Sequence, residues 1–113
     1  MPFIRIETSE KINEEAKEEL TRRLGEAISI IPGKSERWLM LDFCAERNMA
    51  FSGEDGSCAM VTVKLFGSAN SKFYNKLTTR ITEITEDVLS LPPTRTYVQY
   101  EEVYHWGYGG ENF

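Results

Sequence analysis

Histidine and cysteine are scarce in this chain, and their scarcity excludes several kinds of site. The 113 residues include one histidine, His105, and two cysteines, Cys44 and Cys58. A zinc site needs several such ligands at short spacings, so the sequence predicts no bound metal. Two cysteines without a secretory leader indicate a reducing compartment and no disulfide framework. We therefore interpret both cysteines as small apolar side chains of the core.

Basic residues and long apolar runs are also few. The chain has 13 Lys and Arg against 18 Asp and Glu, which gives a net charge of −5. General nucleic-acid binding requires a basic surface, so the composition excludes it. No apolar run is long enough to span a bilayer, and the N-terminus lacks the regions of a signal peptide. These absences predict a cytoplasmic protein that binds neither nucleic acid nor membrane.

What is present is the composition of one folded domain, residues 1–113. Hydrophobic residues make up 41% of the chain and charged residues 27%, which is typical of globular proteins. A domain of this size buries only about two thirds of its chain surface. Association with further copies is therefore expected.

Hydrophobic periodicity divides the chain into two similar halves. In each half, a strand pattern is followed by an amphipathic helix and a second strand. Asn13 and Asn70 are the expected N-caps of the two helices, and Pro32 and Pro92 lie where the helical patterns stop. The predicted strands are residues 3–7, 38–43, 59–66 and 96–103, with a loop at residues 48–57.

Two β-α-β units of this length predict an α+β fold. The caps Asn13 and Asn70 lie 57 residues apart, which indicates a pseudo-symmetric repeat. We expect a four-stranded sheet with both helices on one face. The strands at 38–43 and 59–66 are almost continuously apolar, so the other face needs a cover. Another copy of the chain is the simplest cover.

Pro2 directly follows the initiator methionine. A small second residue favours removal of Met1, and the chain would then begin with a secondary amine. Burial in an apolar pocket beside a cation lowers the pKa of such an amine and makes it usable as a general base near neutral pH. Proline is common at this position, so the residue alone does not indicate a function.

Longer motifs elsewhere are more specific. Residues 49–53 read MAFSG, and residues 93–100 read PTRTYVQY. Together with Pro2, these segments resemble the macrophage migration inhibitory factor (MIF) family of the tautomerase superfamily over nearly the whole chain. Shorter matches fall at residues 2–4, 33–34, 58–59, 67, 75–77, 106–108 and 113. The resemblance implies the tautomerase/MIF fold and a homotrimer with active sites between subunits, which agrees with the uncovered sheet face.

The resemblance also implies a phenylpyruvate-type keto–enol tautomerase without a cofactor. Pro2 is then the base that moves a proton between the carbon and the enol oxygen of a small aromatic 2-oxo acid. Lys34 holds the substrate carboxylate and lowers the pKa of the amine, with Arg37 as a second candidate for that carboxylate. Tyr97 is expected from the neighbouring subunit. The other substrate-binding candidates are Trp38, Phe66, Gln99, Trp106, Tyr108 and Phe113.

Several positions depart from the family pattern. Gln99 replaces the usual asparagine, and Tyr108 replaces the usual tail tryptophan. The tail is two residues shorter between Tyr100 and Trp106, so the pocket rim is expected to differ most. Val61 takes the second position of the family's C-x-x-C pair, which argues against thiol–disulfide activity through that pair.

Two alternatives stay open at this point. The resemblance permits a cytokine-like ligand of a host cell-surface receptor, secreted without a signal peptide and with a vestigial pocket. Other superfamily branches use the N-terminal proline for decarboxylation or dehalogenation, with added arginines and a carboxylate. Arg5, Glu36 and Arg37 are present here, but no spacing marks them for that role. We interpret them as surface charges.

Overall fold

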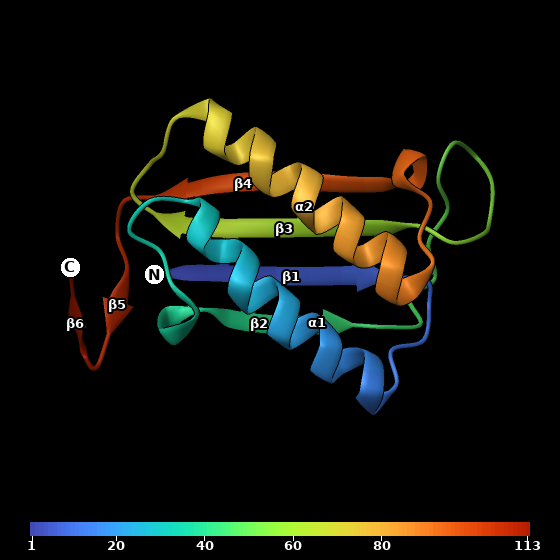
Figure 1. Ribbon diagram of the computed structural model, residues 1–113, viewed down its shortest axis with the longest axis horizontal. Helices are drawn as coiled ribbons and strands as arrows, with labels where there is room; N and C mark the ends of the chain where they lie inside the picture. Colours follow the sequence, from blue (N-terminus) through green and yellow to red (C-terminus); the bar gives the residue numbers. More distant parts are fainter.

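The computed structural model, which describes residues 1–113, has two layers, a four-stranded sheet and two helices that lie on one of its faces (Figure 1). The sheet order is β2-β1-β3-β4. β1 runs parallel to β2, β3 runs parallel to β4, and the two halves meet in the antiparallel pair β1–β3. This confirms the predicted α+β fold with its two β-α-β units. The elements are β1 (Pro2–Thr8), α1 (Glu14–Ala27), β2 (Met40–Cys44), β3 (Ala59–Phe66), α2 (Ser71–Leu89) and β4 (Thr96–Val103).

Both predicted caps open their helices. The side-chain oxygen of Asn13 accepts a hydrogen bond of 2.8 Å from the backbone N–H of Ala16. The side-chain oxygen of Asn70 accepts one of 2.9 Å from the N–H of Lys72. Each bond satisfies a backbone donor that has no partner within the helix.

α1 ends earlier than the apolar period predicts. The period continues to Ile31, but α1 stops at Ala27 and a 3₁₀ turn, Ile28–Ile30, follows. Pro32 is the physical reason, because a residue before proline avoids the helical region. Ile31 is accordingly extended, with φ −80° and ψ 119°. Neither helix is long and apolar enough to cross a membrane.

The core fills the space between the sheet and the helices. Alternate residues of β1 and β3 are buried against the helical layer, as the pleat of a strand requires. Ile6 and Val63 on the sheet, with Leu24 on α1 and Ile81 on α2, are all fully buried. Apolar packing of this kind is the main force that holds the two layers together.

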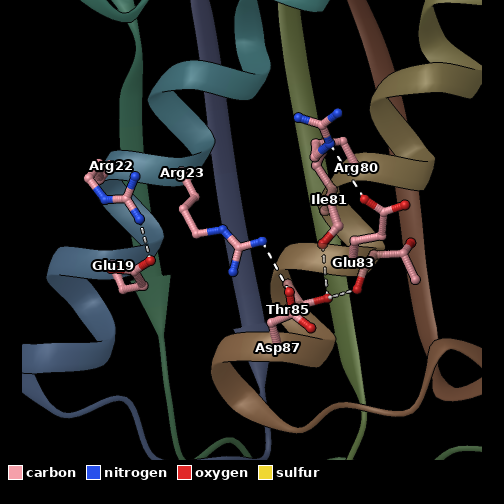
Figure 2. A network of polar contacts seen from close by, with 9 residues as sticks. Glu19, Arg22, Arg23, Arg80, Ile81, Glu83, Thr85 and Asp87 are labelled. Carbon is pink, nitrogen blue, oxygen red and sulfur yellow. Dashed lines mark hydrogen bonds and ion pairs between the residues drawn. The ribbon is translucent and has the colours of Figure 1, made fainter.

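Ion pairs on the outside of the helical layer add little to that packing. Figure 2 shows Arg23 of α1 beside Asp87 of α2, at 3.1 Å, and Arg80 beside Glu83 within α2. Exposed pairs of this type contribute about 0–1 kcal/mol each. The arrangement of the two helices therefore depends mostly on their buried faces.

The opposite face of the sheet carries no helix and is not uniformly apolar. Arg5 of β1 pairs with Asp42 of β2 at 2.8 Å. Lys64 of β3 pairs with Glu101 of β4 at 3.5 Å. The strand period explains this mixture, since residues between the buried ones must point to this side. We refer to this surface as the open face.

Two segments differ from the predicted elements. The strand predicted to begin at Trp38 begins at Met40, because Glu36–Trp38 forms a 3₁₀ turn, η2. The tail, predicted only as a short glycine-rich segment, forms a hairpin of β5 (Gly107–Tyr108) and β6 (Glu111–Asn112). Gly109 and Gly110 connect these strands with φ of 63° and 92°. Left-handed backbone at both central positions is what glycine permits in a tight hairpin turn.

The interpretation of both cysteines as core residues is correct for one of them. Cys58 is buried, at 2% exposure. Cys44 is only half buried and lies at the end of β2, with its sulfur 3.7 Å from a carboxylate oxygen of Asp42. Its register opposite Glu7 of β1 places it on the open face rather than in the core.

Candidate functional site

A cavity of about 520 Å³ opens at the end of the sheet where β1 begins. The N-terminus and the C-terminal hairpin lie at this same end (Figure 1). Pro2 from β1, Trp38 from η2, and Trp106 and Tyr108 from the tail contribute to its wall. The volume lies in the range of small-molecule binding sites.

The N-terminal amine stands in this cavity beside a lysine. Burial lowers the pKa of the Met1 amine, and the positive charge of Lys34 lowers it further. The Lys34 ammonium donates a hydrogen bond of 2.8 Å to the backbone carbonyl of Phe66. The N–H of Phe66 in turn donates one of 3.1 Å to the carbonyl of Met1. The end of β3 therefore holds the amine and the ammonium close together, next to the buried Pro2.

Aromatic rings connect the tail to the rest of the site. The rings of Trp38 and Tyr108 meet edge to face, with their centroids 5.1 Å apart. Phe113 lies 6.5 Å from the Tyr108 ring and 5.7 Å from the Phe66 ring. Edge-to-face and offset contacts at these distances are favourable for aromatic pairs. The hairpin thus forms a wall of the cavity, although no strand period in the tail predicts it.

Two predicted site residues lie elsewhere in the chain. Tyr97 and Gln99 are exposed on β4, where their register partners on β3 are Met60 and Thr62. Pro2, by contrast, pairs with Leu65 near the other end of β3. Met60 and Leu65 are five residue steps apart, or about 16 Å at 3.3 Å per residue, and Thr62 and Leu65 are three steps apart, or about 10 Å. A single chain does not bring Tyr97 or Gln99 to Pro2.

Three cations contribute to the cavity wall, Arg5, Arg37 and Lys64. Arg37 is exposed there, as expected of a surface charge, and it is also the predicted second candidate for the substrate carboxylate. Lys64 is a lining residue that the sequence did not predict. No acidic residue lines the cavity. Arg5 and Lys64 are paired with Asp42 and Glu101, so Arg37 is the cation of the wall whose charge remains available to an anionic ligand. The alternation of the two strands could have predicted that Arg5 and Lys64 lie near each other, because it places them on the same face of two paired strands.

Comparison with known protein families decides where this chain belongs. The family described as Macrophage migration inhibitory factor (MIF) matches residues 1–112. The chain belongs to the macrophage migration inhibitory factor family. The match covers both halves of the repeat, the cavity and most of the tail. Comparison with the sequences of curated proteins gives no significant match.

Solved structures of MIF proteins have the same fold. The MIF2 structure from Leishmania major is 26% identical, with a TM-score of 0.94 over 100% of this chain and 97% of that chain. The MIF homologue from Prochlorococcus marinus is 27% identical, with a TM-score of 0.83 and 98% of each chain covered. A MIF-like protein from Entamoeba histolytica, 22% identical with a TM-score of 0.87, shows the fold alone. Family and fold together support isomerase chemistry of the tautomerase type in general.

Proposed function

We propose that this protein is a phenylpyruvate-type keto–enol tautomerase whose general base is the Pro2 amine, freed by removal of Met1. The observation that carries the proposal is the N-terminal amine, which lies in a cavity with a pKa lowered by burial and by Lys34. Removal of Met1 moves the amine by one residue, to Pro2. Pro2 is buried and directly follows the amine that Lys34 affects, so we expect burial and the charge of Lys34 to act on its nitrogen as well.

The reaction needs a base, a cation and an apolar wall. The Lys34 ammonium holds the carboxylate of the 2-oxo acid, and the aromatic wall of Trp38, Trp106 and Tyr108 holds the aryl group. In the direction of ketonisation, the Pro2 amine takes the proton of the enol hydroxyl and delivers a proton to the neighbouring carbon. The carbonyl forms as the carbon–carbon double bond is protonated. An amine with a lowered pKa can carry out both steps near neutral pH.

The proposal includes a homotrimer with its sites between subunits. Tyr97 and Gln99 are exposed and distant from Pro2 in their own chain. A second copy that supplies its β4 to the cavity would bring these side chains to the substrate. MIF homologues are typically oligomeric, which supports this arrangement. The strands β2 and β4 are both at sheet edges and the open face has no helix, so each is available for contacts with other copies.

Ketonisation of enol-phenylpyruvate, followed by ultraviolet absorbance, tests the assignment of Pro2. The intact mass of the purified protein first establishes that Met1 is gone. The Pro2→Gly variant keeps an N-terminal amine but replaces the secondary amine by a primary one. We expect its kcat/KM to fall about 100-fold or more, as for loss of a positioned general base. Light scattering should show an unchanged oligomer, and unchanged turnover in this variant would refute the role of Pro2.

A further inference from the structure

Arg37 is the cation of the cavity wall without an ion-pair partner. Arg5 is paired with Asp42 and Lys64 with Glu101, whereas Arg37 has no carboxylate within ion-pair distance. Its guanidinium instead lies over the ring of Trp38, 5.0 Å from the ring centroid. Stacking of this kind fixes the guanidinium plane and leaves its N–H groups free to donate within that plane.

Arg37 and Lys34 occupy different parts of the site. Lys34 interacts with the N-terminal amine and with the carbonyl of Phe66, so it lies beside the group proposed to move the proton. Arg37 belongs to the cavity wall together with Trp38, and Lys34 does not. A carboxylate held by Lys34 is therefore attached to the reacting end of the substrate. A group that reaches Arg37 belongs to another part of the same molecule.

The cavity is large enough for such a molecule. Its volume of about 520 Å³ lies within the range of small-molecule pockets and leaves room for a second substituent on the ring of the substrate. Its wall contains three cations and no acid. A substrate with one carboxylate would leave the Arg37 guanidinium without an anionic partner.

We propose that Arg37 binds a second carboxylate of the substrate, so that the protein prefers aryl 2-oxo acids that carry a carboxylate on the ring. The planar guanidinium can donate two parallel hydrogen bonds to a carboxylate. For the reaction, this inference rests on the proposed tautomerase function. The binding preference can be measured without any turnover.

Calorimetric binding of two inert acids tests the preference. Cinnamate has one carboxylate, and 4-carboxycinnamate has a second one on the ring. The protein should bind 4-carboxycinnamate about tenfold more tightly than cinnamate, and Arg37→Gln should remove most of this difference by weakening the binding of 4-carboxycinnamate far more than that of cinnamate. The matched control is Arg80→Gln, which loses the same charge at a residue that does not line the cavity. Arg80 lies on α2 beside Glu83 (Figure 2). The Arg80→Gln variant should keep the full preference.

Three results would overturn the assignment. These are equal binding of the two acids by the unaltered protein, a preference that survives Arg37→Gln, and an equal loss of both affinities in Arg37→Gln. The last result would mean that Arg37 shares the carboxylate held by Lys34. If Arg80→Gln also lost the preference for 4-carboxycinnamate, the preference would depend on the net charge of the protein, and the assignment of Arg37 would again be overturned.

Ketonisation of phenylpyruvate and of 4-carboxyphenylpyruvate separates this inference from the proposed function. We expect kcat/KM to favour the dicarboxylate, and Arg37→Gln to abolish that advantage mainly through KM. Turnover of phenylpyruvate with no dicarboxylate preference would overturn the role of Arg37 and leave the tautomerase proposal standing. Arg37-dependent binding of 4-carboxycinnamate without turnover of either 2-oxo acid would refute the tautomerase proposal and keep Arg37 as the dianion-binding residue.

Discussion

The carboxylate of Glu36 lies directly over Gly25, so that η2 rests on the last turn of α1. A methyl group at Gly25 would overlap the carboxylate and crowd the rest of the Glu36 side chain. Glycine inside a helix is about 1 kcal/mol less favourable than alanine. Its presence here therefore has a packing reason, which is the seat of the turn that carries Arg37 and Trp38.

Gly25→Ala should favour the helical conformation of α1 and weaken ligand binding at the site. The added methyl displaces the Glu36 side chain from its seat on α1, so we expect η2 to be held less firmly and binding of aryl acids to weaken about threefold. The double variant Gly25→Ala/Glu36→Ala removes the overlap. It should restore the affinity and gain roughly 0.5–1 kcal/mol in the free energy of unfolding over Glu36→Ala alone. Titration calorimetry and urea unfolding measure the two effects, and a single variant that binds normally would show that this contact does not position η2.

Lys34→Met should move the pH dependence of catalysis to higher pH. The positive charge of Lys34 lowers the pKa of the N-terminal amine, after the larger effect of burial. Removal of that charge raises the pKa, so a smaller fraction of the amine is free at a given pH. The acid limb of the kcat/KM profile should move to higher pH, and KM should rise because the carboxylate loses its partner. Lys76→Met, which removes one charge from α2, provides the control, and an unmoved limb in Lys34→Met would contradict the electrostatic role.

Arg95 fastens the loop that precedes β3. Its guanidinium donates hydrogen bonds to the carbonyls of Ser57 at 2.9 Å, Glu54 at 3.2 Å and Phe51 at 3.3 Å. Its Cζ atom also lies 5.3 Å from the centre of the Phe51 ring, which packs against Tyr97.

Arg95→Gln should loosen this loop and destabilise the fold by about 1–3 kcal/mol, because charge-assisted hydrogen bonds to several carbonyls are lost. Hydrogen exchange of residues 48–57 should accelerate, while exchange in α1 stays as before. Arg80→Gln, which breaks only an exposed pair within α2, is expected to change stability by less than about 0.5 kcal/mol. Equal effects of the two substitutions would show that Arg95 is an ordinary surface residue.

The Tyr74 hydroxyl should ionise at a higher pH than an ordinary tyrosine. Burial and a hydrogen bond of 2.6 Å to Glu102 raise the pKa of Tyr74 to about 12. A raised pKa in the folded state means that its stabilising effect is complete below the pKa of the unfolded chain, near 10, and is lost as the pH rises toward 12. Spectrophotometric titration of the folded protein should show a late tyrosine step that is absent from Tyr74→Phe. Loss of an early step instead would contradict the hydrogen-bond assignment.

Mixed oligomers test whether sites are shared between subunits. Each shared site would take Pro2 from one subunit and Tyr97 from the next. Pro2→Gly removes the base, and Tyr97→Ala removes the side chain that the neighbouring subunit is expected to supply. Each variant alone should be nearly inactive. After denaturation and joint refolding at equal amounts, roughly a quarter of the sites would combine an intact Pro2 with an intact Tyr97. Activity should return to that extent, and no recovery in demonstrably mixed trimers would show that Tyr97 does not complete the site of a neighbouring subunit.

The sequence alone determines most of the secondary structure. Asn13 and Asn70 act as caps, and the alternation in β1 and β3 separates the core from the open face. These features depend on neighbours a few residues apart, where backbone hydrogen bonding and side-chain direction follow directly from residue type. The same local logic predicts a strand directly after Pro2, at residues 3–7, and places Lys34 just after a helix.

The residues that line the cavity are brought together by contacts between distant segments of the chain. Trp38 leaves its predicted strand because η2 rests on α1, and Arg37 enters the cavity wall with it. The tail hairpin reaches the site only because β4 ends beside the N-terminus, and the position of Tyr97 follows from its register with β3. Strand order, register and the docking of turns are fixed by the packing of the whole core rather than by a local period. The residues that surround the N-terminal amine therefore come from four parts of the chain, and folding brings them together.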